Sequence, residues 1–230
     1  PAEKSPKIKK WLNDLIFPFF CLNCRQEGAP ICADCRKKVS PLSLQVCPVC
    51  EKTLTEKGRC CWLCRSGDFP LDSLIVSADY QNPLVAEAIH LYKYNFVVSL
   101  RFFLGKLLLA GLAKNDFSLP DFLLPVPLHP QRLRWRGFNQ AQLLAEYLGK
   151  NLAPGLEIPM AENWLIRSKK TASQMKIKSA DKRKANLAGA FALNLPAALE
   201  GKNKKLLLVD DVCTTGSTLV ECAKELRKIH

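Results

Sequence analysis

The sequence lacks several features that would place it in other classes of protein. No stretch approaches the ~20 apolar residues that a membrane-spanning helix requires, so we expect no membrane span. No two glycines have the G-x-x-x-x-G-K-[ST] spacing of a Walker A loop, which excludes that kind of nucleotide-phosphate site. Acidic residues are scarce, 21 against 34 lysines and arginines, and the formal charge of +13 favours polyanionic partners or substrates.

The N-terminal segment does not have the pattern of a secretory signal. A basic stretch precedes apolar residues between Lys7 and Cys21, but the apolar positions follow the stripe of an amphipathic helix. We therefore interpret residues 1–17 as a docking helix that ends before Pro18, and we expect a cytoplasmic protein. The chain has no initiator Met and stops at His230 inside an expected helix, so we also expect a trimmed chain that lacks a following strand.

Nine of the eleven cysteines lie between residues 21 and 64, mostly as C-x-x-C pairs. Two such pairs supply the four thiolates of a tetrahedral structural zinc site. We therefore expect a double zinc ribbon over residues 18–66. Pairing in sequence order gives two sets: Cys21, Cys24, Cys32 and Cys35, then Cys47, Cys50, Cys61 and Cys64.

Other arrangements of these cysteines stay open. Interleaved pairing fits the spacing equally well, and Cys60 is able to replace Cys61. A disulfide scaffold would require an oxidising compartment, which the absence of a convincing signal peptide disfavours. The ribbon either braces or dimerises the larger domain, or it contacts nucleic acid. Cys213 and Cys222 lie far from the pairs, and we expect neither to bind metal.

The stretch from Leu206 to Thr218 carries the strongest functional signal. Four apolar residues, Leu206 to Val209, predict a strand buried on both faces, as in parallel sheets. Asp210 and Asp211 follow at the strand end, where ligands bind in open α/β sheets. A helix is expected next, with Thr218 and Glu221 at capping-box spacing. Phosphate is favoured at its start by the loop residues Thr214, Thr215, Gly216, Ser217 and Thr218.

A ribose 5-phosphate satisfies both halves of this stretch. Asp210 and Asp211 would accept hydrogen bonds from the sugar hydroxyls, while the loop holds the 5-phosphate. The segment closely resembles the phosphoribosyl pyrophosphate (PRPP) signature of type I phosphoribosyltransferases. A Walker B strand would need the absent Walker A loop, and a strand whose acids only cap a helix leaves the Thr-Thr-Gly-Ser-Thr run unexplained.

Two further basic stretches suit anionic ligands. The first follows an expected strand and carries His129, Arg132 and Arg136 before a helix, so it suits a pyrophosphate site. The second, residues 167–184, has a local charge of +7 and is interpreted as a mobile loop that closes over the site, with a solvated basic loop as the alternative. Its candidate residues are Arg167, Lys169, Lys170, Gln174 and Arg183.

The rest of the chain alternates strands and helices beyond a boundary at residues 66–70. Strands are expected at 74–80 and 122–126, and helices at 83–94, 98–114 and 139–152. This order predicts an α/β domain over residues 71–230 with a mostly parallel sheet flanked by helices.

Together these motifs resemble the ComF family of competence proteins, which join a zinc ribbon to a type I phosphoribosyltransferase domain. The resemblance covers P-V-P-L-H, R-G-F-N-Q and V-D-D-V-x-T-T-G, with Leu91 to Tyr94 similar to L-x-K-Y and Gln174 to Asn186 similar to a further loop motif. Asn95 replaces an expected glycine and Ser217 an expected alanine.

The resemblance implies a phosphoribosyltransferase that uses PRPP and Mg²⁺, with Asp210 and Asp211 as catalytic residues and an acceptor that the sequence does not identify. It also implies a role in DNA uptake, with single-stranded DNA and competence-machinery proteins as partners. The alternative is a PRPP sensor that binds DNA without transferase turnover. The four tryptophans are scattered along the sequence, so no aromatic platform for DNA is evident.

Overall fold

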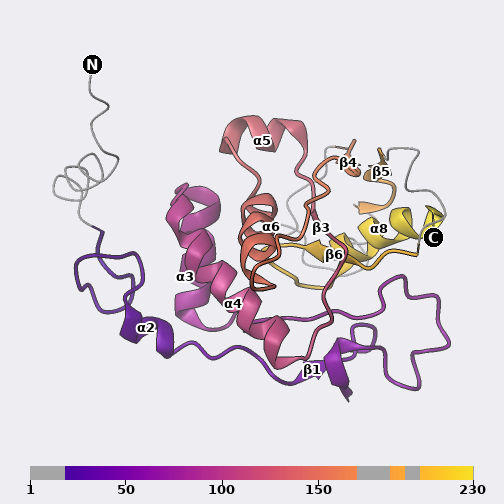
Figure 1. The fold of residues 1–230 in the computed structure, drawn as a ribbon, viewed down its shortest axis with the longest axis horizontal. Coiled ribbons are helices and arrows are strands. Elements are labelled where there is room, and N and C mark those ends of the chain that lie inside the picture. Colours follow the sequence, from indigo (N-terminus) through magenta and orange to yellow (C-terminus); the bar gives the residue numbers. More distant parts are fainter. Residues whose placement is uncertain (1–18, 170–186, 195–202, 230) are drawn as a thin grey trace.

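The computed structural model describes residues 19–169, 187–194 and 203–229. The docking helix expected over residues 1–17 lies outside them, as do Lys170, Gln174, Arg183 and Asn186 of the expected basic loop. The described part combines helices with small sheets, which confirms the mixed α/β class (Figure 1). Among the described helices, none has the length and hydropathy of a membrane span.

Two parallel strands form the centre of the larger domain. Strand β3 (Phe122–Pro125) pairs with β6 (Leu206–Val209), and Phe122 lies opposite Leu206. Alternate side chains enter different cores: Leu207 and Val209 pack with α3, α4 and α6, and Leu206 and Leu208 pack with α8 and β5. The strand predicted over Leu206–Val209 is confirmed and has apolar neighbours on both faces, but it is less buried than predicted, because only Val209 is fully buried and the other three residues are half-buried. The parallel sheet is smaller than expected, because only these two strands pair in parallel among the described residues.

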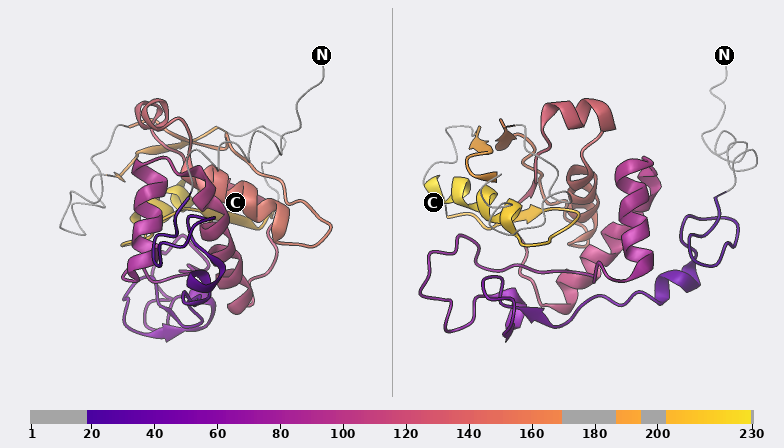
Figure 2. Two further views of the ribbon diagram at one scale, coloured as in Figure 1. Left: turned by 90° about the vertical axis from the view of Figure 1, so that its left-hand side faces the viewer. Right: turned by 180° about the vertical axis from the view of Figure 1, so that it is seen from behind.

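The helices of the larger domain lie around this sheet, as Figure 2 shows from two further sides. They are α3 (Pro83–Tyr94), α4 (Arg101–Lys114), α5 (Pro130–Arg136), α6 (Gln140–Asn151) and α8 (Ser217–Leu226), whereas α2 (Ala33–Lys37) belongs to the cysteine-rich segment and lies apart from the sheet. Helix α3 has the predicted bounds. Helix α4 begins later than predicted, because Val98–Leu100 forms a 3-10 turn. Asn139 caps α6 rather than beginning it, since its Oδ1 accepts a hydrogen bond of 3.1 Å from the Ala141 N–H.

The strand predicted over residues 74–80 does not form. The backbone groups of this segment bond to the N-terminal module instead of to a neighbouring strand. The Leu74 N–H donates to the Gly58 carbonyl at 2.9 Å, and the Val76 N–H donates to the Gln45 side chain at 2.8 Å. The buried side chain of Gln45 thus occupies the place that a strand partner would take.

An antiparallel pair and one helix were not anticipated. Strand β4 (Leu165–Arg167) pairs with β5 (Phe191–Leu193), and the pair contacts the α8 side of the sheet. Helix α5 begins with Pro130 and ends at Gly137, whose φ of 80° is a conformation that glycine adopts readily.

The cysteine-rich module runs along the side of the molecule opposite α5 (Figures 1 and 2). Its first part surrounds α2, and Cys21, Cys35 and Val39 join the core formed by α3 and α4. Its second part surrounds the short antiparallel pair β1 (Gln45–Val46) and β2 (Leu54–Thr55). The module therefore packs against the larger domain and leaves the α5 side uncovered.

Candidate functional site

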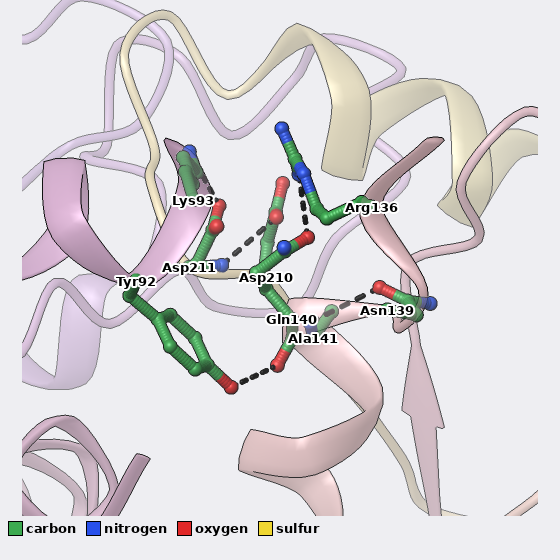
Figure 3. A network of polar contacts seen from close by, with 8 residues as sticks. All are labelled: Tyr92, Lys93, Arg136, Asn139, Gln140, Ala141, Asp210 and Asp211. Carbon is green, nitrogen blue, oxygen red and sulfur yellow. Dashed lines mark hydrogen bonds and ion pairs between the residues drawn. The ribbon is translucent and has the colours of Figure 1, made fainter. Parts of the chain in front are cut away.

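Asp210 and Asp211 lie at the carboxyl end of β6, beside the segment that leads from β3 to α5. Because β3 and β6 are parallel, both strands deliver their following loops to the same edge. The Asp210 Oδ1 accepts a hydrogen bond of 2.8 Å from the Asp211 N–H. Figure 3 shows the two carboxylates between the end of α3 and the start of α6.

Lys93, near the end of α3, forms an ion pair with Asp211. Its Nζ lies 2.9 Å from the Asp211 Oδ1, and the two side chains are only 17% and 9% exposed. Burial opposes the charge on Lys93, but the Asp211 and Asp210 carboxylates outweigh it and raise the pKa of the ammonium group. The site therefore holds one cation directly against its acidic pair.

Asp210 has a different electrostatic environment from its neighbour. Burial, followed by the nearby charge of Asp211, raises the pKa of Asp210 to about 7, although Lys93 partly opposes this. A carboxyl group with such a pKa changes its protonation near neutral pH. A buried carboxyl group with a pKa raised in this way is typical of functional sites.

The expected phosphate loop leads directly into α8. Gly216 is the N-cap residue with φ 66°, a conformation that disfavours a side chain, and it offers no side-chain cap to the first-turn N–H groups. The predicted capping box is wrong, because Thr218 is the second residue of the helix. Thr215 Oγ1 and Ser217 Oγ share a hydrogen bond of 2.7 Å, while Thr214 is exposed at the rim.

Two buried donors near the carboxylates have no hydrogen-bond partner among the described residues. Arg136 donates through Nη1 to the Gln140 Oε1, which leaves the Arg136 Nε and the Gln140 Nε2 unsatisfied. Gln140 is 2% exposed, and Tyr92 secures its backbone by an O–H···O bond of 3.1 Å to its carbonyl. Unsatisfied buried donors are costly, so their presence beside Asp210 indicates a place for an acceptor-rich ligand.

The other predicted basic residues, His129, Arg132, Arg167 and Lys169, lie on different elements. His129 caps α5, where its Nδ1 accepts from the Gln131 N–H at 3.3 Å. Arg132 lies in α5, close enough to the buried Arg167 to lower the pKa of that guanidinium, after burial itself. Arg167 was expected in a mobile loop, but it is the last residue of β4 and stacks on Phe191 at 5.3 Å. The exposed Lys169 donates to the Ala188 carbonyl.

The eight predicted cysteine ligands form two clusters in sequence order. Within each cluster the sulfur atoms lie within 4.8 Å of one another, and the second uses Cys61 rather than Cys60. A tetrahedral zinc ion with bonds of ~2.3 Å would place its sulfurs about 3.8 Å apart. The Sγ atoms of Cys24 and Cys32 are 3.6 Å apart and those of Cys50 and Cys61 are 3.9 Å apart, so both clusters are compatible with zinc.

The environment of the thiols also suits a cation. In the second cluster, N–H groups of Lys52 and Thr53 lower the pKa of Cys50 to about 6, whereas hydrogen bonding with Cys61 raises the pKa of Cys64 to about 12. Four neighbouring thiols do not all ionise together unless a positive charge lies between them. Cys222 is fully buried in α8 and belongs to neither cluster, nor does Cys213.

Sequence reasoning missed two residues of this site. Lys93 and Gln140 stand within the L-x-K-Y and R-G-F-N-Q motifs, but their contacts with Asp211 and Arg136 depend on elements that are distant in sequence. Lys93 lies in a helix and contacts an acid that follows a distant strand. Such a contact produces no periodic pattern in the sequence around the lysine. The motif match itself was the available signal.

Comparisons with known proteins give a consistent relationship. The chain is 33% identical over 224 residues to Competence protein F of Haemophilus influenzae, covering 93% of each chain. It is 33% identical over 220 residues to the DNA utilization protein YhgH of Escherichia coli, covering 92% of each. It is 28% identical over 202 residues to Competence protein ComFC of Bacillus subtilis, covering 82% of this chain and 74% of the relative. No protein-family model matches. Given these identities over nearly its whole length, the chain belongs to the ComF family of competence proteins.

Proposed function

We propose that the protein binds PRPP with Mg²⁺ and transfers its phosphoribosyl group to an acceptor. The observation that carries the proposal is the meeting of two half-buried carboxylates, an uncapped helix start and two unsatisfied donors at one sheet edge. Asp210 and Asp211 would accept hydrogen bonds from the ribose hydroxyls. Residues 214–218 would hold the 5-phosphate, because the helix start offers N–H groups and the positive end of a dipole.

The leaving pyrophosphate would lie on the Arg136 side of the carboxylates. When the bond between C1 and the pyrophosphate oxygen breaks, the electron pair leaves with the pyrophosphate, and the acceptor nucleophile bonds to C1. Arg136 and Arg132 would stabilise the growing negative charge, and Asp211 the positive character of the sugar. Mg²⁺ that enters with PRPP would supply further neutralisation of the charge on the leaving pyrophosphate.

Lys93 would position Asp211 in this scheme. Its ammonium group lies 2.9 Å from the Asp211 Oδ1 and holds that side chain in place in the ligand-free protein. A pre-placed carboxylate requires no rearrangement during the reaction, which is how electrostatic preorganisation lowers a barrier.

We also propose that both cysteine clusters bind structural zinc. Eight thiols in two compact groups, with spacings near those of a tetrahedral site, support this. The ribbons would hold residues 21–64 in shape, since this segment forms only one five-residue α-helix, one three-residue 3-10 helix and two two-residue strands.

A second candidate function is single-stranded DNA handling in natural transformation, either beside the transferase activity or without turnover. A charge of +13 favours it, as do the words competence and DNA utilization in the names of the relatives. The test is pyrophosphate release from PRPP and Mg²⁺ with a broad panel of acceptors. Release that is lost in Asp210→Asn supports the enzyme. PRPP binding without release from any acceptor supports the sensor.

A further inference from the structure

Four aromatic side chains gather beside the carboxylates, where the segment after α3 meets α5. They are Tyr94, Phe96, Trp135 and Phe138, and we call them the aromatic platform. The Phe96 ring lies 5.4 Å from Trp135 and 6.4 Å from Phe138 between centroids, both edge to face. Trp135 is nevertheless 61% exposed and Phe96 is 41% exposed. The rings therefore hold one another in place while leaving much of their surface open.

The backbone of Phe96 has a strained conformation. Its φ is 57°, a left-handed conformation that bulky residues rarely adopt. The ComF resemblance predicts a glycine at Asn95, yet Asn95 has an ordinary φ of −105° and the unusual conformation falls on the next residue. Strained residues cluster at ligand-binding sites, because a conformation that lowers stability is retained in evolution when it is needed for function.

The platform is also cationic. Residues 128–141 contain three arginines and no Asp or Glu. The Arg136 guanidinium carbon lies 5.7 Å from the Tyr94 ring centroid and 5.9 Å from that of Trp135, and Arg134 is exposed. The same Arg136 bonds to Gln140 in the carboxylate site, so one side chain joins the two surfaces.

We propose that the aromatic platform is the binding surface for single-stranded DNA, with unpaired bases stacked on Phe96 and Trp135 and backbone phosphates beside Arg134. This rests on the proposed role in DNA handling and specifies its face. Exposed rings beside arginines suit a strand whose bases are free to stack, whereas a duplex hides its base faces. Helix α5, which carries Trp135, lies on the side of the molecule away from the cysteine-rich module, so the proposal assigns DNA binding to the α5 side rather than to the ribbons (Figures 1 and 2).

The test is fluorescence anisotropy of the full chain with a labelled 20-nucleotide oligo(dT). Trp135→Ala and Phe96→Ala should each weaken binding about tenfold, the loss typical of one stacked base. Trp135→Phe keeps a ring and should stay within about threefold of the parent, which separates stacking from misfolding. The matched control is Trp62→Ala, which removes a more exposed tryptophan from the cysteine-rich module and should have no effect.

The outcomes separate this inference from the proposed function. PRPP binding, measured by calorimetry, should be unchanged in Phe96→Ala, because the Phe96 ring contacts Trp135 and Phe138 rather than Arg136. Full DNA binding by both alanine variants, or a loss in Trp62→Ala instead, overturns the platform and leaves DNA handling intact. Equal affinity for thymidine monophosphate and the 20-mer overturns it in favour of a nucleotide pocket, and the absence of any DNA binding by the parent protein overturns both. DNA binding without PRPP binding retains the platform and refutes the PRPP site.

Discussion

Replacing Asp210 with asparagine should stabilise the ligand-free protein, and the gain should increase with pH. Burial and the charge of Asp211 raise the pKa of Asp210 from 3.8 to about 7. A raised pKa favours the protonated folded state, so the stability from this group is complete below pH ~4 and is lost as pH rises through 7. Asparagine has the same shape, carries no charge and keeps an oxygen that can accept from the Asp211 N–H.

The magnitude follows from the size of the shift. At about 1.4 kcal/mol per pH unit, the raised pKa of Asp210 costs the folded state roughly 4 kcal/mol at pH 8.5, where the group is ionised, and roughly 2 kcal/mol at pH 5.5, where the folded state keeps a proton that the unfolded chain loses. The advantage of the variant should therefore increase by about 2 kcal/mol between these pH values. For a chain of this size that corresponds to a difference in melting temperature of ~4–8 °C.

The assay is thermal unfolding of both proteins by circular dichroism at pH 5.5 and 8.5. Asp121→Asn is the control, because the Lys205 backbone N–H and the Lys204 side chain lower the pKa of Asp121 below 3.8. Stability from a lowered pKa is lost only in acid, so this control should show the same difference from the parent at both pH values. An advantage of Asp210→Asn that does not change with pH would refute the assigned environment of Asp210.

Three other perturbations have distinct expected results. Lys93→Met removes the buried partner of Asp211 and should cost about 3–5 kcal/mol in urea unfolding; an unchanged midpoint would show that the pair is not formed. Gly216→Ala forces a side chain into φ 66°, so it should lower the free energy of unfolding by about 1–2 kcal/mol and weaken PRPP binding in calorimetry. The control is Gly137→Ala, at φ 80° with no atom near the added carbon, which should lower the free energy of unfolding as much and leave PRPP binding intact. A strong chelator should release two zinc ions per chain, measured by atomic emission, and make residues 21–64 sensitive to protease; one ion or none would contradict the two sites.

The parts of the fold that follow local rules could be predicted from the sequence. Helix α3 begins at a proline after an asparagine cap, and both signals lie within a few residues of each other. Strand β6 is a short apolar run that follows two lysines and ends at two aspartates, and the C-x-x-C pairs specify their own spacing. In each case the decisive contacts lie close together along the chain.

The remainder depends on contacts between distant segments. The expected strand at residues 74–80 has the right composition, but the Gln45 side chain and the Gly58 carbonyl take its hydrogen bonds. The aromatic platform joins the end of α3 to α5, so its residues look scattered in the sequence. Such pairings are set by packing, which hydrophobic periodicity does not encode.

The central claim is that the carboxylates after β6 and the start of α8 together bind an activated ribose 5-phosphate. Isothermal titration calorimetry of PRPP with Mg²⁺ tests it most directly, on the parent protein and on Asp210→Asn. Saturable binding at one site per chain, lost in the variant and competed by ribose 5-phosphate, is the predicted result. No heat with the parent protein, or equal affinity in the variant, would contradict the account.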